Sequence, residues 1–261
     1  MAEAIEKKQV LIDPEKCIGC GLCKKDCVSF DIEIKDGKAV PKGKGCIMCG
    51  HCEAVCPQGA VKITGFDDEI EEYDEQVRLD PQQLMEAIKT RRTIRQFTDK
   101  KVPQEVIDLI FEAGRMAPTG ANSQGTKYVL LDEKKDECEA VAVKMFGSLV
   151  NTGKKVIPLL SSMEIDSHFF FKKAPLVIVI FGKDAVSASL AAENMTFMAE
   201  VCGLGVLFSG FFTTCVNMSS KIRKIMKVGK KPKAVTTLVM GYPAVKYHRT
   251  PHRKPLNMTK A

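Results

Sequence analysis

Apolar residues recur at helical spacing in two places soon after residue 80. Leu84, Met85 and Ile88 follow Asp80 and Pro81, which supply an N-cap acceptor and a proline for the first helical position. Because residues three and four apart share one face of a helix, we expect a helix from residue 81 with this stripe buried. A second helix is expected to begin at Pro103, with the inward residues Val106, Ile107, Ile110 and Phe111.

A continuous apolar run from Pro175 to Phe181 predicts a strand that is buried on both faces, at the centre of a sheet. Further strands are expected over residues 127–131, 206–209 and 234–240, and helices over residues 133–149, 185–202 and 219–227. Residues 150–173 lack such a pattern and end in His168 and three phenylalanines. A loop of this length is often a lid or binding loop, and the alternative is that the phenylalanines pack in the core.

The chain before residue 67 has a different character, with short strand patterns at residues 9–12, 32–34 and 61–63. Residues 67–80 then hold one basic and eight acidic side chains and have no clear apolar face. We therefore expect three parts: a small domain over residues 1–66, an acidic linker over residues 67–80, and a larger domain over residues 81–261 that ends in a basic arm.

Eight of the eleven cysteines stand in the small domain, in two matching runs. Each run has the spacing C-x₂-C-x₂-C-x₃-C, and Pro57 follows the second. In this pattern the first three thiolates of one run and the fourth of the other bind one [4Fe–4S] cluster. One cluster is therefore assigned to Cys17, Cys20, Cys23 and Cys56, and the other to Cys46, Cys49, Cys52 and Cys27.

Zinc is the main alternative, since C-x₂-C pairs also form tetrahedral zinc sites. Two runs of four with a trailing Cys-Pro fit zinc poorly, and no signal peptide precedes them to favour a disulfide framework. Residues 8–66 resemble a bacterial ferredoxin with two such clusters, although Val28 stands where that family usually has proline. The other thiols, Cys138, Cys202 and Cys215, are expected to be buried structural residues.

Composition and charge limit the kinds of protein that the larger domain can be. The 261 residues are 45% hydrophobic, which suits a globular core, and no apolar run reaches the roughly 18 residues that span a bilayer. We therefore expect no membrane segment and, without a targeting segment, a cytoplasmic protein. Of the formal charge of +7, residues 81–261 carry +13. An anionic cofactor or an acidic partner fits that charge, whereas no nucleic-acid-binding motif accompanies it.

Three arginines and a hydroxyl follow the first helix of the larger domain: Arg91, Arg92, Thr93 and Arg95. Arginine can grip a phosphate through two parallel hydrogen bonds, so the group could clamp an anion. Basic residues also complement the dipole at a solvated helix end. Charge alone leaves both interpretations open.

This segment is similar to a motif of the nitroreductase family, R-R-[ST]-x-R-x-[FY]. Residues 117–124 are similar to that family's A-P-[ST]-x-x-N-x-Q loop. The helix before Gly203, which leads to Ser209 and Gly210, is a third similarity, and Gly241-Tyr242-Pro243 with its following basic residues is a fourth. The resemblance spans residues 81–255 and implies an α+β fold. In it, an FMN-binding sandwich with a mixed sheet wrapped by helices follows the ferredoxin-like domain.

The resemblance also implies roles for individual residues. The phosphate, ribityl chain and N1/O2 edge of FMN would be held by Arg91, Arg92, Thr93 and Arg95, with Arg253 and Arg249 adding phosphate contacts from the arm. The FMN bound mainly by the other subunit would be reached by Pro118, Thr119, Gly120, Asn122 and Gln124. The Gly210 N–H would lie near flavin N5, beside Ser209, where many relatives carry an acidic residue. No catalytic nucleophile is expected.

By this resemblance the protein is expected to be a homodimer that shares each FMN between its subunits. Electrons from an external donor, a reduced ferredoxin, flavodoxin or NAD(P)H, would pass through two [4Fe–4S] clusters to FMN. They would then reduce a nitroaromatic, a quinone or a similar conjugated electrophile. One alternative is direct NAD(P)H oxidation at the flavin, with auxiliary clusters. Another is an electron carrier with no small-molecule substrate of its own.

Overall fold

The computed structural model describes residues 8–68, 70–72, 78–153 and 162–260. Parts of the predicted linker and of the predicted irregular segment, residues 69, 73–77 and 154–161, lie outside these ranges. The chain forms two compact units. One unit reaches to Val77 and includes Gly120–Ser123, and the other is formed by Arg78–Thr119 and Gln124–Ala261.

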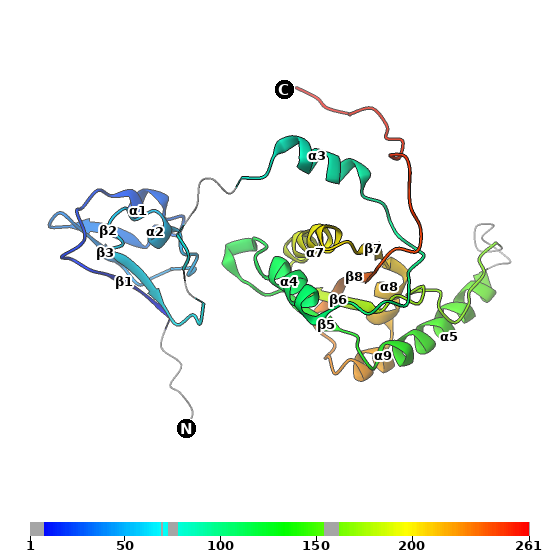
Figure 1. Ribbon diagram of the computed structural model, residues 1–261. Coiled ribbons are helices and arrows are strands. Elements are labelled where there is room, and N and C mark those ends of the chain that lie inside the picture. The colour runs from blue at the N-terminus through cyan, green and yellow to red at the C-terminus, as the bar shows by residue number, and fades with distance from the viewer. Residues whose placement is uncertain (1–7, 69, 73–77, 154–161, 261) are drawn as a thin grey trace. The chain divides into compact units, whose positions relative to one another are not determined.

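The first unit contains two small antiparallel sheets (Figure 1). In one, β1 (Gln9–Ile12) pairs with β4 (Val61–Thr64), and in the other β2 (Ile32–Lys35) pairs with β3 (Lys38–Pro41). The helices α1 (Leu22–Asp26) and α2 (His51–Ala54) begin directly after Gly21 and Gly50. Both glycines adopt positive φ angles, of 75° and 80°, that suit glycine. The three predicted strands are confirmed, while β3 and both helices carried no periodic pattern to predict them.

The second unit is built round a four-stranded sheet in the order β5-β6-β8-β7. Its strands are β5 (Lys127–Leu130), β6 (Leu176–Gly182), β7 (Gly205–Phe208) and β8 (Lys233–Gly241). These strands pair antiparallel, and an isolated bridge joins Thr93 to Val206 in the parallel sense. Every residue of β6 is buried, as the continuous apolar run predicts.

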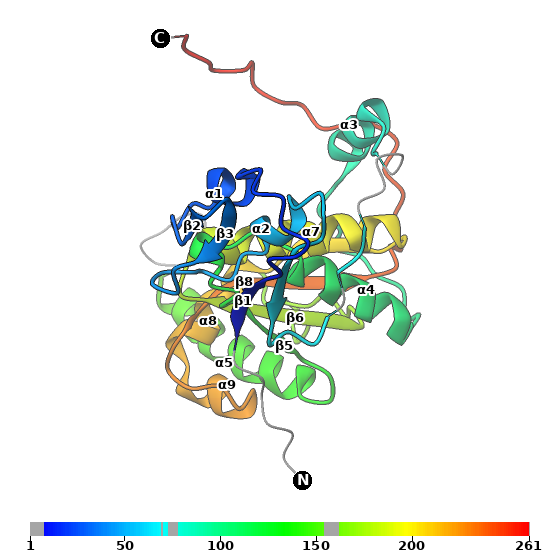
Figure 2. The same cartoon turned by 90° about the vertical axis from the view of Figure 1, so that its left-hand side faces the viewer.

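Helices cover both faces of this sheet (Figures 1 and 2). One face carries α4 (Gln104–Arg115) and α7 (Ala185–Val201), and the other α5 (Lys135–Gly153), α8 (Gly210–Met218) and α9 (Ser220–Ile225). Alternate residues of β6 serve the two cores: Ile178 packs with α4 and α7, and Val179 packs with α5 and α8. This three-layer arrangement is the sandwich that the family resemblance implies. The expected mixed sheet is not seen among the four strands, which all pair antiparallel, and the parallel contact at Thr93 is an isolated bridge. Helix α8 was not predicted.

Helix α3 (Pro81–Thr90) forms where Asp80 and Pro81 predict it, and the Asp80 carboxylate accepts from the N–H of Gln83 at 2.8 Å. The prediction that its apolar stripe is buried is wrong for the single chain. Leu84, Met85 and Ile88 are 39%, 50% and 46% exposed. Spacing alone defines an apolar face, and it does not say whether the same chain covers that face.

Other expectations concern burial. Ile110 of α4 is fully buried, and its predicted inward neighbours pack around the same core. Phe170 and Phe171 are core residues, and Cys138 and Cys215 are buried, while Cys202 is partly exposed. None of the helices in the described part of the chain is long and apolar enough to cross a membrane.

Candidate functional site

The eight clustered cysteines line two separate cavities in the first unit. One cavity is lined by Cys17, Cys20, Cys23 and Cys56, and the other by Cys27, Cys46, Cys49 and Cys52. Each cavity thus takes three thiols from one run and the fourth from the other, which is the division that the spacing predicts for two cubane clusters. Among the described residues, no group of three or more Cys, His, Asp or Glu side chains is arranged so that it could hold a single metal ion. The ligand role of the eight thiols stays a prediction.

Backbone amides point at several of these sulfurs. The N–H groups of Asp31, Ala39, Met48 and Ala60 donate to Cys27, Cys17, Cys46 and Cys56 at 3.3 to 3.4 Å. Such bonds stabilise negative charge on sulfur and tune the potential of a bound cluster. The N–H of Ala39 is the main cause that lowers the pKa of Cys17, whereas burial raises the pKa of Cys52 to about 11. Burial therefore opposes negative charge on Cys52, and the four amide donors are the feature of these cavities that suits anionic, cluster-bound thiolates.

In the second unit, the arginine-bearing segment lies against β7. The N–H of Ile94 donates to the carbonyl of Val206 at 3.1 Å, and Thr93 forms the bridge to the same residue. A Cβ at Gly205 would lie 2.2 Å from Cγ1 of Ile94, so this close approach requires glycine. Since β7 leads directly into Ser209 and Gly210, two predicted motifs that are far apart in the sequence meet here.

The residues after β8 complete this arrangement. The N–H of Thr98 donates to the carbonyl of Tyr242 at 2.9 Å, and the hydroxyl of Tyr247 lies 3.5 Å from the carbonyl of Thr93. The guanidinium of Arg92 lies 5.2 Å from the centre of the Tyr247 ring, which is within cation–π range. The first, third and fourth predicted motifs therefore come together in the second unit.

Arg91 supplies a direct test of whether this segment fits a phosphate. Its Nη1 is buried and has no hydrogen-bond partner among the described residues. Leaving a buried polar group unpaired costs about 1–3 kcal/mol, and such an atom in a native protein often marks a ligand. Burial raises the pKa of the nearby Glu200, and the charge of Arg91 opposes that rise. The residues fit a phosphate-bearing cofactor.

Part of the predicted flavin loop belongs to the first unit, a placement that the sequence did not predict. Gly120–Ser123 belongs to the first unit, where the Asn122 side-chain amide donates to the carbonyls of Ile47 and Met48 at 3.1 and 2.8 Å. These two residues stand between Cys46 and Cys49. The neighbouring Thr119 hydroxyl accepts from the N–H of Gln124 at 3.0 Å, and Pro118 is exposed.

Ser209 and Gly210 stand where β7 passes into α8. Ser209 is buried, and its hydroxyl donates to the carbonyl of Phe170 at 3.1 Å. Gly210 is exposed and begins the helix. The N–H groups at a helix start suit an electron-rich acceptor.

The two arginines that the resemblance assigns to the C-terminal arm lie at the surface. Arg249 and Arg253 are both exposed, and Arg253 donates to the carbonyl of its neighbour His252. Beyond β8, the described residues form no further helix or strand. A role for either arginine at the phosphate stays a prediction, as do the flavin roles of the other residues.

Fold and site together define an α+β protein with an arginine-bearing segment at one sheet edge and a cysteine-rich N-terminal unit. Residues 88–242 match the nitroreductase family, and residues 9–57, which contain all eight clustered cysteines, match a 4Fe–4S dicluster domain. The chain therefore belongs to the nitroreductase family. It is a nitroreductase-family oxidoreductase with an N-terminal iron–sulfur domain.

Individual relatives agree with this assignment. A protein of Methanothermobacter thermautotrophicus, provisionally named NADH dehydrogenase/NAD(P)H nitroreductase, is 26% identical over 62% of this chain and 78% of its own. An iodotyrosine deiodinase of Hydra vulgaris is also 26% identical, over 66% of this chain and 69% of its own. A nitroreductase of Bacteroides fragilis, solved with bound FMN, has a TM-score of 0.52 at 18% identity, over 68% of this chain and 98% of its own. That last likeness concerns the fold.

Proposed function

We propose that this protein is an FMN-dependent oxidoreductase that passes electrons from an external donor, through two [4Fe–4S] clusters, to a small conjugated electrophile such as a nitroaromatic or a quinone. The observation that carries the proposal is the presence, in one chain, of two four-cysteine cavities and a buried, unpaired guanidinium nitrogen at Arg91. FMN supplies the junction between one-electron and two-electron chemistry. In this proposal, residues 1–66 bind the two clusters, residues 67–80 form the linker, and residues 81–261 bind the flavin.

The chain's own residues have separate tasks in this proposal. Arg91 binds the FMN phosphate, and Arg92, Thr93 and Arg95 orient the ribityl chain and the N1/O2 edge, where positive charge favours the reduced anionic ring. The N–H of Gly210, at the start of α8, would lie near flavin N5. The FMN in the solved relative from Bacteroides fragilis supports this cofactor.

We also propose that the active protein is a homodimer. Helix α3 leaves its apolar stripe exposed, and Leu256 and Met258 of the C-terminal segment are 84% and 62% exposed. Apolar surface of this kind, on a helix and an extended arm, is typical of a face that a second subunit covers. A shared flavin would then be reached by Pro118, Thr119, Gly120, Asn122 and Gln124 of the other copy.

Direct oxidation of NAD(P)H at the flavin is the second candidate, because the relative from Methanothermobacter thermautotrophicus carries NAD(P)H in its name. Anaerobic purification followed by metal, sulfide and flavin analysis tests the cofactors. We expect about eight irons and about one FMN per chain. Stopped-flow mixing with reduced ferredoxin, reduced flavodoxin or NADPH then separates the donors. Rapid reduction of the flavin by NADPH without prior reduction of the clusters would favour the second candidate.

A further inference from the structure

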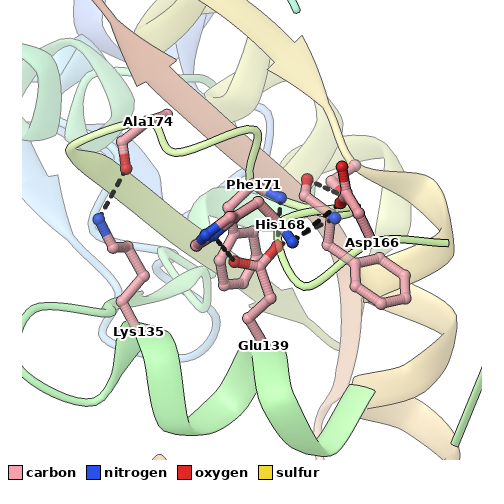
Figure 3. A network of polar contacts seen from close by, with 8 residues as sticks. Lys135, Glu139, Asp166, His168, Phe171 and Ala174 are labelled. Carbon is pink, nitrogen blue, oxygen red and sulfur yellow. Dashed lines mark hydrogen bonds and ion pairs between the residues drawn. The ribbon is translucent and has the colours of Figure 1, made fainter. Parts of the chain in front are cut away.

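Glu139 of α5 is a buried carboxylate for which the proposed function gives no role. It is 3% exposed, and its Oε1 accepts from the N–H groups of Phe170 and Phe171 at 3.0 and 2.7 Å. Its Oε2 lies 3.6 Å from Nδ1 of His168, whose side chain is 43% exposed (Figure 3). One carboxylate therefore fixes the backbone of two consecutive phenylalanines from inside the core.

Other charged groups surround this contact. Lys135, one turn earlier on α5, donates to the carbonyl of Ala174 at 2.8 Å, and the Asp166 carboxylate accepts from the N–H of His168 (Figure 3). Asp136 and Lys144 line the same cavity as Glu139 and His168. Helix α5 thus makes polar contacts with the segment 166–174 from Lys135 and Glu139, and of these two only Glu139 bonds to Phe170. The ring of Phe146, also on α5, packs edge to face against the Phe170 ring at 5.6 Å.

The carbonyl of Phe170 continues the network toward the proposed flavin site, since it accepts the hydroxyl of Ser209 at 3.1 Å. Serine at this position usually caps a helix by accepting from its first-turn N–H groups. Ser209 makes no such capping bond to α8. Its hydroxyl donates instead to the Phe170 carbonyl, and the N–H of the same peptide group, that of Phe171, donates to Glu139.

We propose that Glu139 is a positioning residue for the flavin end of α8. By fixing Phe170, it holds the Ser209 hydroxyl away from α8, so that the first-turn N–H groups beginning at Gly210 stay available to the cofactor. The proposal rests on the proposed placement of FMN at Gly210. Without Glu139, the Phe170 carbonyl shifts and the Ser209 hydroxyl is released to cap the N–H of Phe211 or Phe212.

Amide-resolved hydrogen exchange on the full-length protein with FMN added in excess tests this directly. In Glu139→Leu, exchange at Phe170 and Phe171 should become about tenfold faster, because both N–H groups lose a charged acceptor. Exchange at Phe211 or Phe212 should become about fivefold slower, because a capping bond forms there. The slowing should vanish in the double variant with Ser209→Ala, since the cap then has no hydroxyl.

Two further variants separate positioning from general loosening. Lys135→Met removes the other polar contact between α5 and the same segment, and it should leave α8 exchange and the FMN reduction potential unchanged. Glu139→Gln keeps one acceptor oxygen and should show a smaller change than Glu139→Leu. In Glu139→Leu the potential of bound FMN should shift.

Faster exchange at Phe170 and Phe171 without slowing in α8 would overturn the proposal, as would an equal effect of Lys135→Met on α8. A protein that retains no FMN would overturn the proposed function instead, while the exchange pattern would still test the role of Glu139.

Discussion

The backbone N–H of Ile94 donates to the carbonyl of Val206, over 3.1 Å. This bond places an arginine-rich segment that follows α3 beside a strand more than a hundred residues later in the chain. The strand leads into Ser209 and Gly210, and shortly after the arginines the N–H of Thr98 donates to the carbonyl of Tyr242. The geometry of the proposed flavin site therefore depends on the edge of the sheet at β7.

Gly205→Ala should disrupt this edge. A methyl group there would lie 2.2 Å from Cγ1 of the buried Ile94, and overpacking of this kind costs typically about 1–3 kcal/mol. We expect a lower melting temperature and less FMN per purified chain. Gly147→Ala on α5 is the control, because nothing lies within 4 Å of a Cβ there. Equal FMN content in both variants would contradict the role of this contact.

Arg91→Met should weaken FMN binding. The variant keeps the apolar stem but removes the buried guanidinium, and a hydrogen bond to a charged group contributes about 1.5–3 kcal/mol. The dissociation constant, measured by fluorescence titration of the cofactor-depleted protein, should rise at least about tenfold. Arg115→Met is the matched control, since Arg115 pairs with Glu112 on the surface of α4. An unchanged constant in Arg91→Met would remove this residue from the phosphate site.

Helical spacing and continuous apolar runs were enough to predict most elements of the second unit, because its sheet is buried on both faces. The cysteine spacing also predicted which thiols share a cavity, although those thiols lie far apart in the sequence. The contact between Asn122 and Met48 and the network at Glu139 could not be predicted. Both depend on backbone carbonyl and N–H groups whose positions are fixed by tertiary packing, and neither leaves a pattern of side chains. The exposed apolar face of α3 likewise shows that helical spacing predicts the face of a helix and does not predict whether that face is buried.

Burial raises the pKa of Glu139, while the N–H groups of Phe171 and Phe170 and the charge of His168 oppose the rise. The folded protein therefore holds this proton to a higher pH than the unfolded chain, whose carboxyl has an ordinary value of 4.5. Stability relative to Glu139→Gln should be highest below 4.5 and should fall as the pH rises from 4.5 through the raised pKa. Anaerobic thermal unfolding of both proteins across this range measures the difference. A difference that grows with pH would contradict the sign.

Ile88→Glu should weaken the proposed dimer. A charge in the middle of the exposed stripe of α3 would have to be buried without a partner when two subunits associate. Sedimentation should show a shift toward monomer, accompanied by loss of FMN because the site is shared. Leu190→Glu on α7 is the control, with a side chain of similar exposure, 44% against 46%. If both variants sediment as the parent protein does, α3 does not form the interface.

The central claim is that electrons reach the flavin through the clusters, and Cys20→Ala tests it most directly. Cys202→Ala, outside both cysteine runs, is the control. The measurement is anaerobic turnover of a nitroaromatic, driven either by a reduced protein donor or by chemical reduction of the bound FMN with dithionite. The account predicts that Cys20→Ala abolishes donor-driven turnover and keeps the dithionite-driven reaction, while Cys202→Ala keeps both. Donor-driven turnover by Cys20→Ala at the parent rate would contradict it.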